Sequence, residues 1–455
     1  MKNEHEYLAT EPVGPLLFKL AFPTVVAQLI NMLYNIVDRI YIGHMPVVGD
    51  LALTGVGVCM PIIMIVTAFA ALVSSGGAPR ASIYMGRKDN DTAEKILGGC
   101  FFVQIVISLS LMLILLFWNK EILMMFGASV NTIEYATSYM KIYAMGTLFV
   151  QVTLGMNAFI TAQGFTRTSM ISVLIGAITN IILDPIFIFV FDMGVAGAAW
   201  ATILSQALSC TWVILFLISK RTILKLRPKY IRYTHSIVMP CLILGLAAFI
   251  MQSSESVITV CFNSSLLRYG GDIAVGAMTI LSSVMMFAML PLQGIAQGAQ
   301  PITSYNYGAK NVDRVKKCFK LLLISSLIYS LALGATVMFL PKVYVSIFTP
   351  KPELIEYASW ALRIYGAGIA IFGIQIACQQ TFTAIGKAKQ AIICAVFRKF
   401  ILLIPLIYIM PLFMANKEAG VYMAESISDI AAVIFTATMF FFEFRKALQN
   451  INHEF

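Results

Sequence analysis

The sequence predicts an all-α integral membrane protein, with twelve transmembrane helices in two parallel six-helix repeats around a central cleft. Three observations predict this fold: the composition, the apolar runs and an internal repeat. The 455 residues are 59% hydrophobic and only 12% charged, whereas soluble domains carry about 25% charged residues. Apolar runs long enough for a helix of about 20 residues to cross a bilayer occur at 16–43, 52–75, 96–118, 135–160, 170–190, 194–218, 237–267, 273–297, 318–340, 357–384, 391–413 and 418–443.

The internal repeat keeps one offset of 222 residues through most of the chain. The segment GDLAL at 49–53 returns as GDIAV at 271–275, and KIY at 141–143 returns as RIY at 363–365. Six spans per half is an even number, so both halves enter the membrane with the same polarity and are related by an axis along its normal. We therefore expect an amino-terminal lobe at 1–219, a cytoplasmic connector at 220–236 and a carboxyl-terminal lobe at 237–455.

The net charge of +10 comes from loops on one side of the predicted bilayer. Lys and Arg concentrate at 80–95, 220–232, 310–320 and 445–446, whereas loops of the other parity hold few. The positive-inside rule then places both termini in the cytoplasm of a multi-pass protein of the cell membrane. Some of these basic residues are expected to contact anionic lipid. A nucleic-acid partner is not expected, because no basic stripe lies on a soluble domain.

The sequence contains no pattern typical of an enzyme. Predicted loops are too short for a catalytic domain, no GxxxxGK[ST] phosphate loop occurs, and no Ser/His or metal-binding constellation is present. The polar start MKNEHEYLATEPVG lacks the features of a cleaved signal, so the first span is expected to remain. We expect no catalytic residue and no cofactor, and uphill transport would draw on an ion gradient.

Polar residues inside the first-half spans are the main candidates for function. A charged group at the bilayer centre costs about 2.5–3.5 kcal/mol, so it needs a reason to be there. Gln28, Asn31, Asn35 and Asp38 share one helix face, and Asn180 shares a face with Asp184, which precedes Pro185. The proline removes a backbone donor and frees carbonyl oxygens nearby. Two carboxylates and an amide suit a proton or a small hard cation.

Two structural explanations compete with that interpretation. The polar face of 16–43 can hold its helix against neighbours by hydrogen bonds. Each acid can also be paired with its own base, for which Arg39 is the candidate near Asp38, although it lies about 100° around the helix.

The second half offers a less regular set of polar residues. Glu255 has no base at helical spacing, which makes it the better second-half candidate for function. Arg398 and Lys399 on one span and Glu425 and Asp429 on the next are expected to form a structural ion pair, although their estimated depths do not match well. The residues expected to line the cleft, from both halves, are Gln28, Asn31, Asn35, Asn157, Gln252, Glu255, Gln293, Gln297, Gln375 and Gln379.

Several motifs resemble the multidrug and toxic compound extrusion (MATE) family over nearly the whole chain. They are NIVDRIYIGH, NIILDPIFIF followed by GVAGAAWAT, and the expected loops GGAPRASIYMGRKD and GAQPITSYNYGAKN. The resemblance implies two six-helix lobes that export drugs or metabolites in exchange for protons or sodium ions. It also implies a cation site in the amino-terminal lobe, whose residues match Asp38, Asn180, Asp184 and Thr202.

Some members of that family use a second acid pair in the carboxyl-terminal lobe. Glu255 matches the first acid, but the span expected to hold the second reads IFGIQIACQQ and contains none. This departure favours coupling through the amino-terminal lobe.

The leading hypothesis is a monomeric exporter of amphiphilic, cationic small molecules, coupled to protons or sodium ions and working by alternating access. One alternative is a flippase for lipid-linked saccharides or another amphiphile, for which a more basic cavity is expected. A second alternative, a transporter of the major facilitator type, is suggested only by GRKD at 86–89. The sequence names neither the substrate nor the coupling ion.

Overall fold

The computed structural model describes residues 7–45 and 49–452, and within those ranges the chain forms helices and no strand. The amino-terminal lobe contains α1 (Tyr7–Thr10), α2 (Val13–Gly43), α3 (Gly49–Gly86), α4 (Asn90–Phe117), α5 (Asn119–Met125), α6 (Ile133–Ala162), α7 (Thr166–Pro185), the π-helix η1 (Ile186–Val190) and α8 (Gly194–Ile218).

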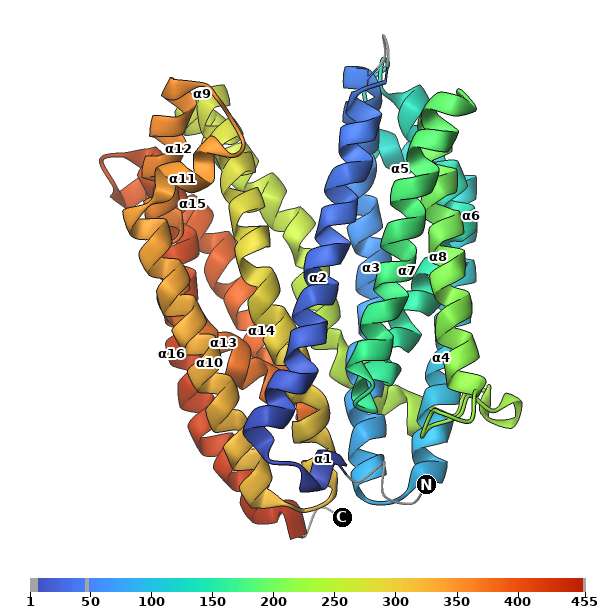
Figure 1. Cartoon of the computed structure of the whole chain (residues 1–455). Coiled ribbons are helices and arrows are strands. Elements are labelled where there is room, and N and C mark those ends of the chain that lie inside the picture. Colours follow the sequence, from blue (N-terminus) through green and yellow to red (C-terminus); the bar gives the residue numbers. More distant parts are fainter. Residues whose placement is uncertain (1–6, 46–48, 453–455) are drawn as a thin grey trace.

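The second half begins after a short 3-10 turn, η2 (Pro228–Tyr230). It contains α9 (His235–Gly308), α10 (Val312–Phe339), α11 (Pro341–Ser346), α12 (Pro352–Tyr365), α13 (Ile369–Ala384), α14 (Ala388–Val396), the π-helix η3 (Phe397–Leu403), α15 (Ile404–Phe413), α16 (Lys417–Gln449) and η4 (Asn450–Asn452). Figure 1 shows two bundles that meet at the end where α1 lies, which we call the α1 end, and that diverge toward the opposite end.

The described helices account for the twelve expected spans. Ten helices are long and apolar enough to cross a membrane, and the pair α12 and α13 adds one more. The helix α9 supplies two spans, because it reverses at Gly271, which has φ 66° and ψ −158°. Only glycine adopts such a conformation readily. The expected connection between 267 and 273 is therefore confirmed, and it consists of a sharp reversal at Gly271 with helix on either side.

The span expected at 357–384 is broken in the structure. Its two parts, α12 and α13, are bent by 48° around residues 366–368. Ser426 of α16 stabilises the break, because its hydroxyl donates to the carbonyls of Ile364 and Tyr365 and accepts from the Gly368 N–H at 3.3 Å. A neighbouring helix thus satisfies the backbone groups that the bend leaves unpaired.

The internal repeat is visible in the backbone conformation as well as in the amino-acid sequence. Asp89 caps α4 by accepting from Thr92 N–H, and its repeat partner Asn311 caps α10 in the same way. The residues just before these caps, Lys88 and Lys310, have φ of 63° and 59°. The two halves therefore turn from one span to the next by the same device, as the parallel repeat predicts.

Reciprocal contacts between repeat partners join the lobes at the α1 end. A Cβ on Gly86 would lie 2.0 Å from the carbonyl oxygen of Tyr305, and a Cβ on Gly308 would lie 1.9 Å from that of Ile83. Both pairs obey the 222-residue offset. Each helix therefore contributes one glycine and one carbonyl, and those of α9 are the repeat partners of those of α3. Glycine at these two positions lets α3 and α9 approach backbone to backbone.

The expectation that residues 76–89 and 298–311 form loops is wrong. The segments are mostly helical, since α3 continues to Gly86 and α9 to Gly308. Small and polar residues there make close contacts between the lobes, and they are not evidence of a loop. Exposed apolar side chains such as Phe18, Phe117 and Phe413 (72–82% exposed) cover the outside of the bundle, as expected for lipid contact.

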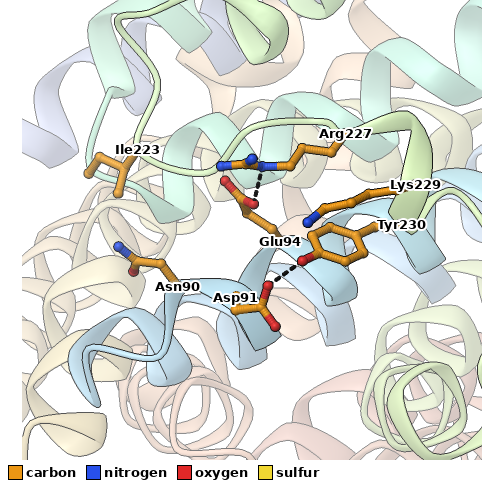
Figure 2. Close-up of a pocket in the computed structure, with 7 residues that line it drawn as sticks. All are labelled: Asn90, Asp91, Glu94, Ile223, Arg227, Lys229 and Tyr230. Carbon is orange, nitrogen blue, oxygen red and sulfur yellow. Dashed lines mark hydrogen bonds and ion pairs between the residues drawn. The ribbon is translucent and has the colours of Figure 1, made fainter.

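The connector lies against the amino-terminal lobe. The buried side-chain oxygen of Gln163 accepts hydrogen bonds from Thr222 Oγ1 and from the N–H groups of Ile223 and Leu224, at 2.8–2.9 Å. Figure 2 shows the cavity of about 280 Å³ between the connector and α4, which is lined by Asn90, Asp91, Glu94, Ile223, Arg227, Lys229 and Tyr230.

An ion pair and a hydrogen bond join residues that line this cavity. Arg227 pairs with Glu94, and the Tyr230 hydroxyl donates to Asp91. Its hydrogen bond to Glu94 raises the pKa of the Arg227 guanidinium. The basic connector is thus held by acids of α4.

Candidate functional site

The candidate ion site consists of Asp38, Asn180 and Asp184 at the contact between α2 and α7. The side chains of Asn180 and Asp184 are completely buried, whereas Asp38 is only partly exposed and is largely enclosed by protein. Helical spacing puts Asn180 and Asp184 on one face, and α2 presents Asp38 to that face. Pro185 ends α7, and the chain continues as the π-helix η1, so the regular bonding pattern is interrupted directly beside Asp184.

The three side chains lie near one another. Asn180 Nδ2 donates to Asp184 Oδ1 at 3.3 Å. The carboxyl group of Asp38 lies close enough to that of Asp184 for the two to influence each other electrostatically. The structure thus brings together three of the four residues that the family resemblance implied.

Each of these three residues keeps one oxygen without a hydrogen bond. Asp38 Oδ1, Asn180 Oδ1 and Asp184 Oδ2 are buried, and no donor within the described residues reaches them. Buried polar atoms are nearly always paired, so three orphaned oxygens at one place indicate a missing positive partner. Two carboxylate charges held near each other and shielded from water also repel each other. A shared proton or a small cation removes both penalties.

Thr202 is not hydrogen-bonded to the acids. Its hydroxyl donates to the carbonyl of Ala198 in its own helix at 3.0 Å. Tyr139 is close enough to both Thr202 and Asp38 to be influenced by each, so Thr202 lies in the neighbourhood of the site.

Two further residues at the site were missed from the sequence. Tyr34 interacts with both acids and with Gln206, whose Oε1 is another buried oxygen without a donor among the described residues. Tyr34 lies four residues before Asp38, and Gln206 four after Thr202. A spacing of four residues places two side chains on one helix face, so the sequence already placed Tyr34 on the face of Asp38 and Gln206 on the face of Thr202.

Arg39 does not neutralise Asp38 in the structure. Its side chain is exposed, and none of the ion pairs formed by the described residues joins it to Asp38. The structural alternative of an acid paired with the adjacent base is therefore wrong for this residue.

Two expected cleft residues form hydrogen bonds between the lobes. Gln28 Nε2 donates to Gln297 Oε1 at 3.1 Å, and Gln252 Nε2 donates to Thr67 Oγ1 at 3.0 Å. Further hydrogen bonds between the lobes, made by Thr24, Ser82, Asn306 and Arg314, lie closer to the α1 end. Among these interactions, the ones at Gln28 and Gln252 lie farthest from the α1 end.

The other expected cleft residues are spread over both lobes. Asn31 and Asn35 continue along α2 toward Asp38, and Asn35 donates to the Asn31 carbonyl at 2.6 Å. Asn157 donates to the Ser169 carbonyl within the amino-terminal lobe at 3.3 Å. Gln375 and Gln379 contact each other at 3.4 Å on α13, and Gln293 is exposed. These residues do not converge on one point.

The carboxyl-terminal lobe holds five charged side chains that we call the charge cluster, namely Glu255, Arg398, Lys399, Glu425 and Asp429. Arg398 contacts Asp429 at 2.7–2.8 Å and Glu425 at 3.0 Å, and its guanidinium lies 4.5 Å from the centre of the Phe372 ring.

The expected ion pair between the last two spans is therefore present. The expected mismatch in depth is wrong, because Arg398 contacts both Glu425 and Asp429 directly. Lys399 differs from the expectation, since it pairs with Glu255 at 2.6 Å. The sequence analysis considered only bases at helical spacing from Glu255. Lys399 was therefore missed, because it lies on a different helical segment.

A family model described as MatE matches residues 23–186 and again 246–409, once in each half of the chain. The chain belongs to the MatE family. This membership rules out the major facilitator alternative, and it agrees with the multi-pass membrane architecture of MATE transporters. The two separate matches also coincide with the two lobes of the structure.

Curated relatives of similar length include proteins named "Multidrug export protein MepA". The chain is 25% identical to the one from Staphylococcus haemolyticus (strain JCSC1435), over 90% of each sequence. It is also 25% identical to the one from Staphylococcus aureus (strain NCTC 8325 / PS 47), over 95% of this chain and 96% of that protein.

Solved structures share the complete fold. A structure titled "Crystal structure of MATE in the bent conformation" has a TM-score of 0.92 at 22% identity and covers 99% of both chains. A second, described as the outward-facing conformation of a multidrug resistance MATE family transporter, has a TM-score of 0.90 at 21% identity with the same coverage. At these identities the likeness shows the fold alone.

Proposed function

We propose that this MATE protein exports amphiphilic, cationic drugs or metabolites across the cell membrane in exchange for a proton or a sodium ion. Membership of the family and the names of the staphylococcal relatives support multidrug export. The observation that carries the coupling is the group of three buried oxygens without donors at Asp38, Asn180 and Asp184. We propose that Thr202 joins them when the ion is bound.

Alternating access would follow from the arrangement of the contacts between the lobes. The hydrogen bonds described above lie toward the α1 end, which the distribution of Lys and Arg predicts to be cytoplasmic, together with both termini. The present conformation would then be closed toward the cytoplasm. An ion that binds the acid pair with different affinity in the two states would shift the protein between them. We propose that a single chain performs this cycle.

The polar residues beyond Gln28 on α2, such as Asn31 and Asn35, would line the path of the cargo. Those on α9 and α13, with Asn157 of the amino-terminal lobe, remain candidates for the same role. The flippase alternative required a more basic cavity. We favour efflux because both buried bases of the charge cluster are already paired with acids.

The test is ion-driven transport by purified protein in proteoliposomes. Efflux of a cationic fluorescent drug would be measured with an imposed sodium gradient and, separately, with a pH gradient. Asp38→Asn and Asp184→Asn should each reduce ion-driven transport by more than about tenfold, because neither can bind the ion with a full charge. Asp313→Asn, an exposed residue at the α1 end, is the matched control and should transport normally.

Undiminished exchange in both aspartate variants would refute the coupling role. Elution of each variant as a single peak in size-exclusion chromatography would separate loss of coupling from loss of folding. The gradient that drives the wild-type protein would identify the coupling ion.

A further inference from the structure

The charge cluster of the carboxyl-terminal lobe has a role that an ordinary structural ion pair does not require. Its three acids and two bases leave one negative charge without a permanent partner. Arg398 serves both Glu425 and Asp429, so the excess charge lies on that side of the cluster. Lys399 is bonded to Glu255, while Arg398, the residue directly before it in η3, is bonded to Glu425. Glu425 is therefore the acid of the cluster to which the ammonium group of Lys399 could turn if it left Glu255.

Glu255 and Lys399 differ sharply in accessibility. The Glu255 side chain is 44% exposed, whereas that of Lys399 is only 3% exposed. A carboxylate that is nearly half exposed can be reached by a charged molecule from solvent, whereas the ammonium group of Lys399 cannot.

The helical position of Glu255 indicates the direction that it faces. Gln252, three residues earlier on the same face of α9, donates to Thr67 of the other lobe. Glu255 therefore lies on the face of α9 that is turned toward the amino-terminal lobe, and its exposure shows that this lobe does not cover it. The two bundles diverge away from the α1 end (Figure 1), so a molecule between the lobes could reach the Glu255 carboxylate.

We propose that Glu255 binds the positive charge of the cargo and that Lys399 is a tethered cation, which occupies Glu255 when cargo is absent and turns to Glu425 when cargo arrives. This inference rests on the proposed export of cationic compounds and names the residue that recognises them. The cargo class is a monovalent organic cation on an apolar body, whose charge can replace an ammonium group at a carboxylate. A buried ammonium group left without a partner is strongly destabilised, and pairing with Glu425 avoids this.

The same arrangement gives the lobes different tasks. None of the ion pairs formed by the described residues includes Asp38 or Asp184, so these two acids can take the coupling ion. Glu255 has a base of its own, so a small ion gains little there, whereas a cargo that also makes apolar contacts can compete with Lys399.

Binding of a dye to the purified full-length protein in detergent tests the proposal. Fluorescence polarisation at pH 8 would follow rhodamine 6G, which is cationic, and Nile red, which is uncharged. Lys399→Met removes the competitor and should tighten rhodamine 6G binding roughly fivefold or more. Glu255→Gln should weaken it by a similar factor, and neither change should alter Nile red binding. Lys316→Met, at an exposed position of α10, is the matched control.

A third variant separates this mechanism from a purely structural role. Glu425→Gln leaves Arg398 paired with Asp429 but takes away the second partner of Lys399, so rhodamine 6G should bind more weakly. Adding Lys399→Met to Glu425→Gln should restore tight binding, because no ammonium group then needs a partner.

Rhodamine 6G affinity that is unchanged or weaker in Lys399→Met, or unchanged in Glu255→Gln, would overturn the proposal. Absence of saturable dye binding in both the wild type and Lys399→Met would overturn it as well. Binding in detergent needs no ion gradient, so this result is independent of the Asp38 and Asp184 transport assay. Loss of exchange in those variants with no effect of Lys399 on binding would refute this inference alone.

Discussion

Alanine at Gly86 and Gly308 should open the contact at the α1 end. Each added Cβ would meet a backbone carbonyl of the other lobe at 1.9–2.0 Å, whereas non-bonded carbon contacts are most favourable at about 3.5–4.0 Å. The obstacle is backbone in both cases, so no side-chain rotation relieves it. The two helices must move apart by more than about 1 Å. A conformation in which the lobes separate at the α1 end would provide that space.

The size of the effect follows from the cost of overpacking. Extra methyl groups in a well-packed contact cost about 1–3 kcal/mol. Applied only to the conformation closed at the α1 end, that cost changes the ratio of the two states by about 5- to 150-fold. A protein that rests almost entirely in the present conformation would then populate the other measurably.

Distances between spin labels would measure this shift. Asn90→Cys and Lys316→Cys place labels on exposed positions of the two lobes near the α1 end, in a background where Cys210 and Cys261 are alanine because these native cysteines are not fully buried. The double alanine variant should move the distance distribution toward longer values.

The controls are Gly57→Ala and Gly276→Ala, since an added Cβ at either position meets nothing within 4 Å. Both should leave the distances unchanged. A distribution for Gly86→Ala/Gly308→Ala that matches the wild type would refute the argument that close glycine contacts hold this end shut, and so would an equal shift in the controls.

Two other predictions concern stability, measured by thermal unfolding in detergent. Gln163→Leu removes the acceptor of three hydrogen bonds from the connector and leaves buried N–H groups unpaired, so it should cost about 1–3 kcal/mol; an unchanged midpoint would show that the connector is not held this way. Gly271→Ala forces a side chain into a backbone conformation suited to glycine and should cost about 1–3 kcal/mol, whereas Gly276→Ala in the same helix should be neutral or slightly stabilising.

The candidate ion site was largely predictable because its signal is local. Membrane acids are costly and therefore rare, and the spacing of Asn180 and Asp184 within one helix fixes that they share a face. The contact of Asp184 with Asp38 required the family resemblance or the structure, since it joins α7 to α2. Tyr34 and Gln206 were missed because aromatic and amide side chains are common in these helices and stand out only once their neighbours are known.

The sequence alone determined that the chain is a membrane protein of two parallel lobes, because bilayer thickness imposes span length and a repeated chain repeats its fold. Only the tertiary structure decided which segments between spans are helical and which charges meet. The stretches before Gly86 and Gly308 looked like loops, since contacts between lobes favour the small residues that also favour turns. Lys399 pairs with Glu255, which lies 144 residues away in the sequence. Ion pairs depend on distance in space, and spacing along one helix does not encode that distance.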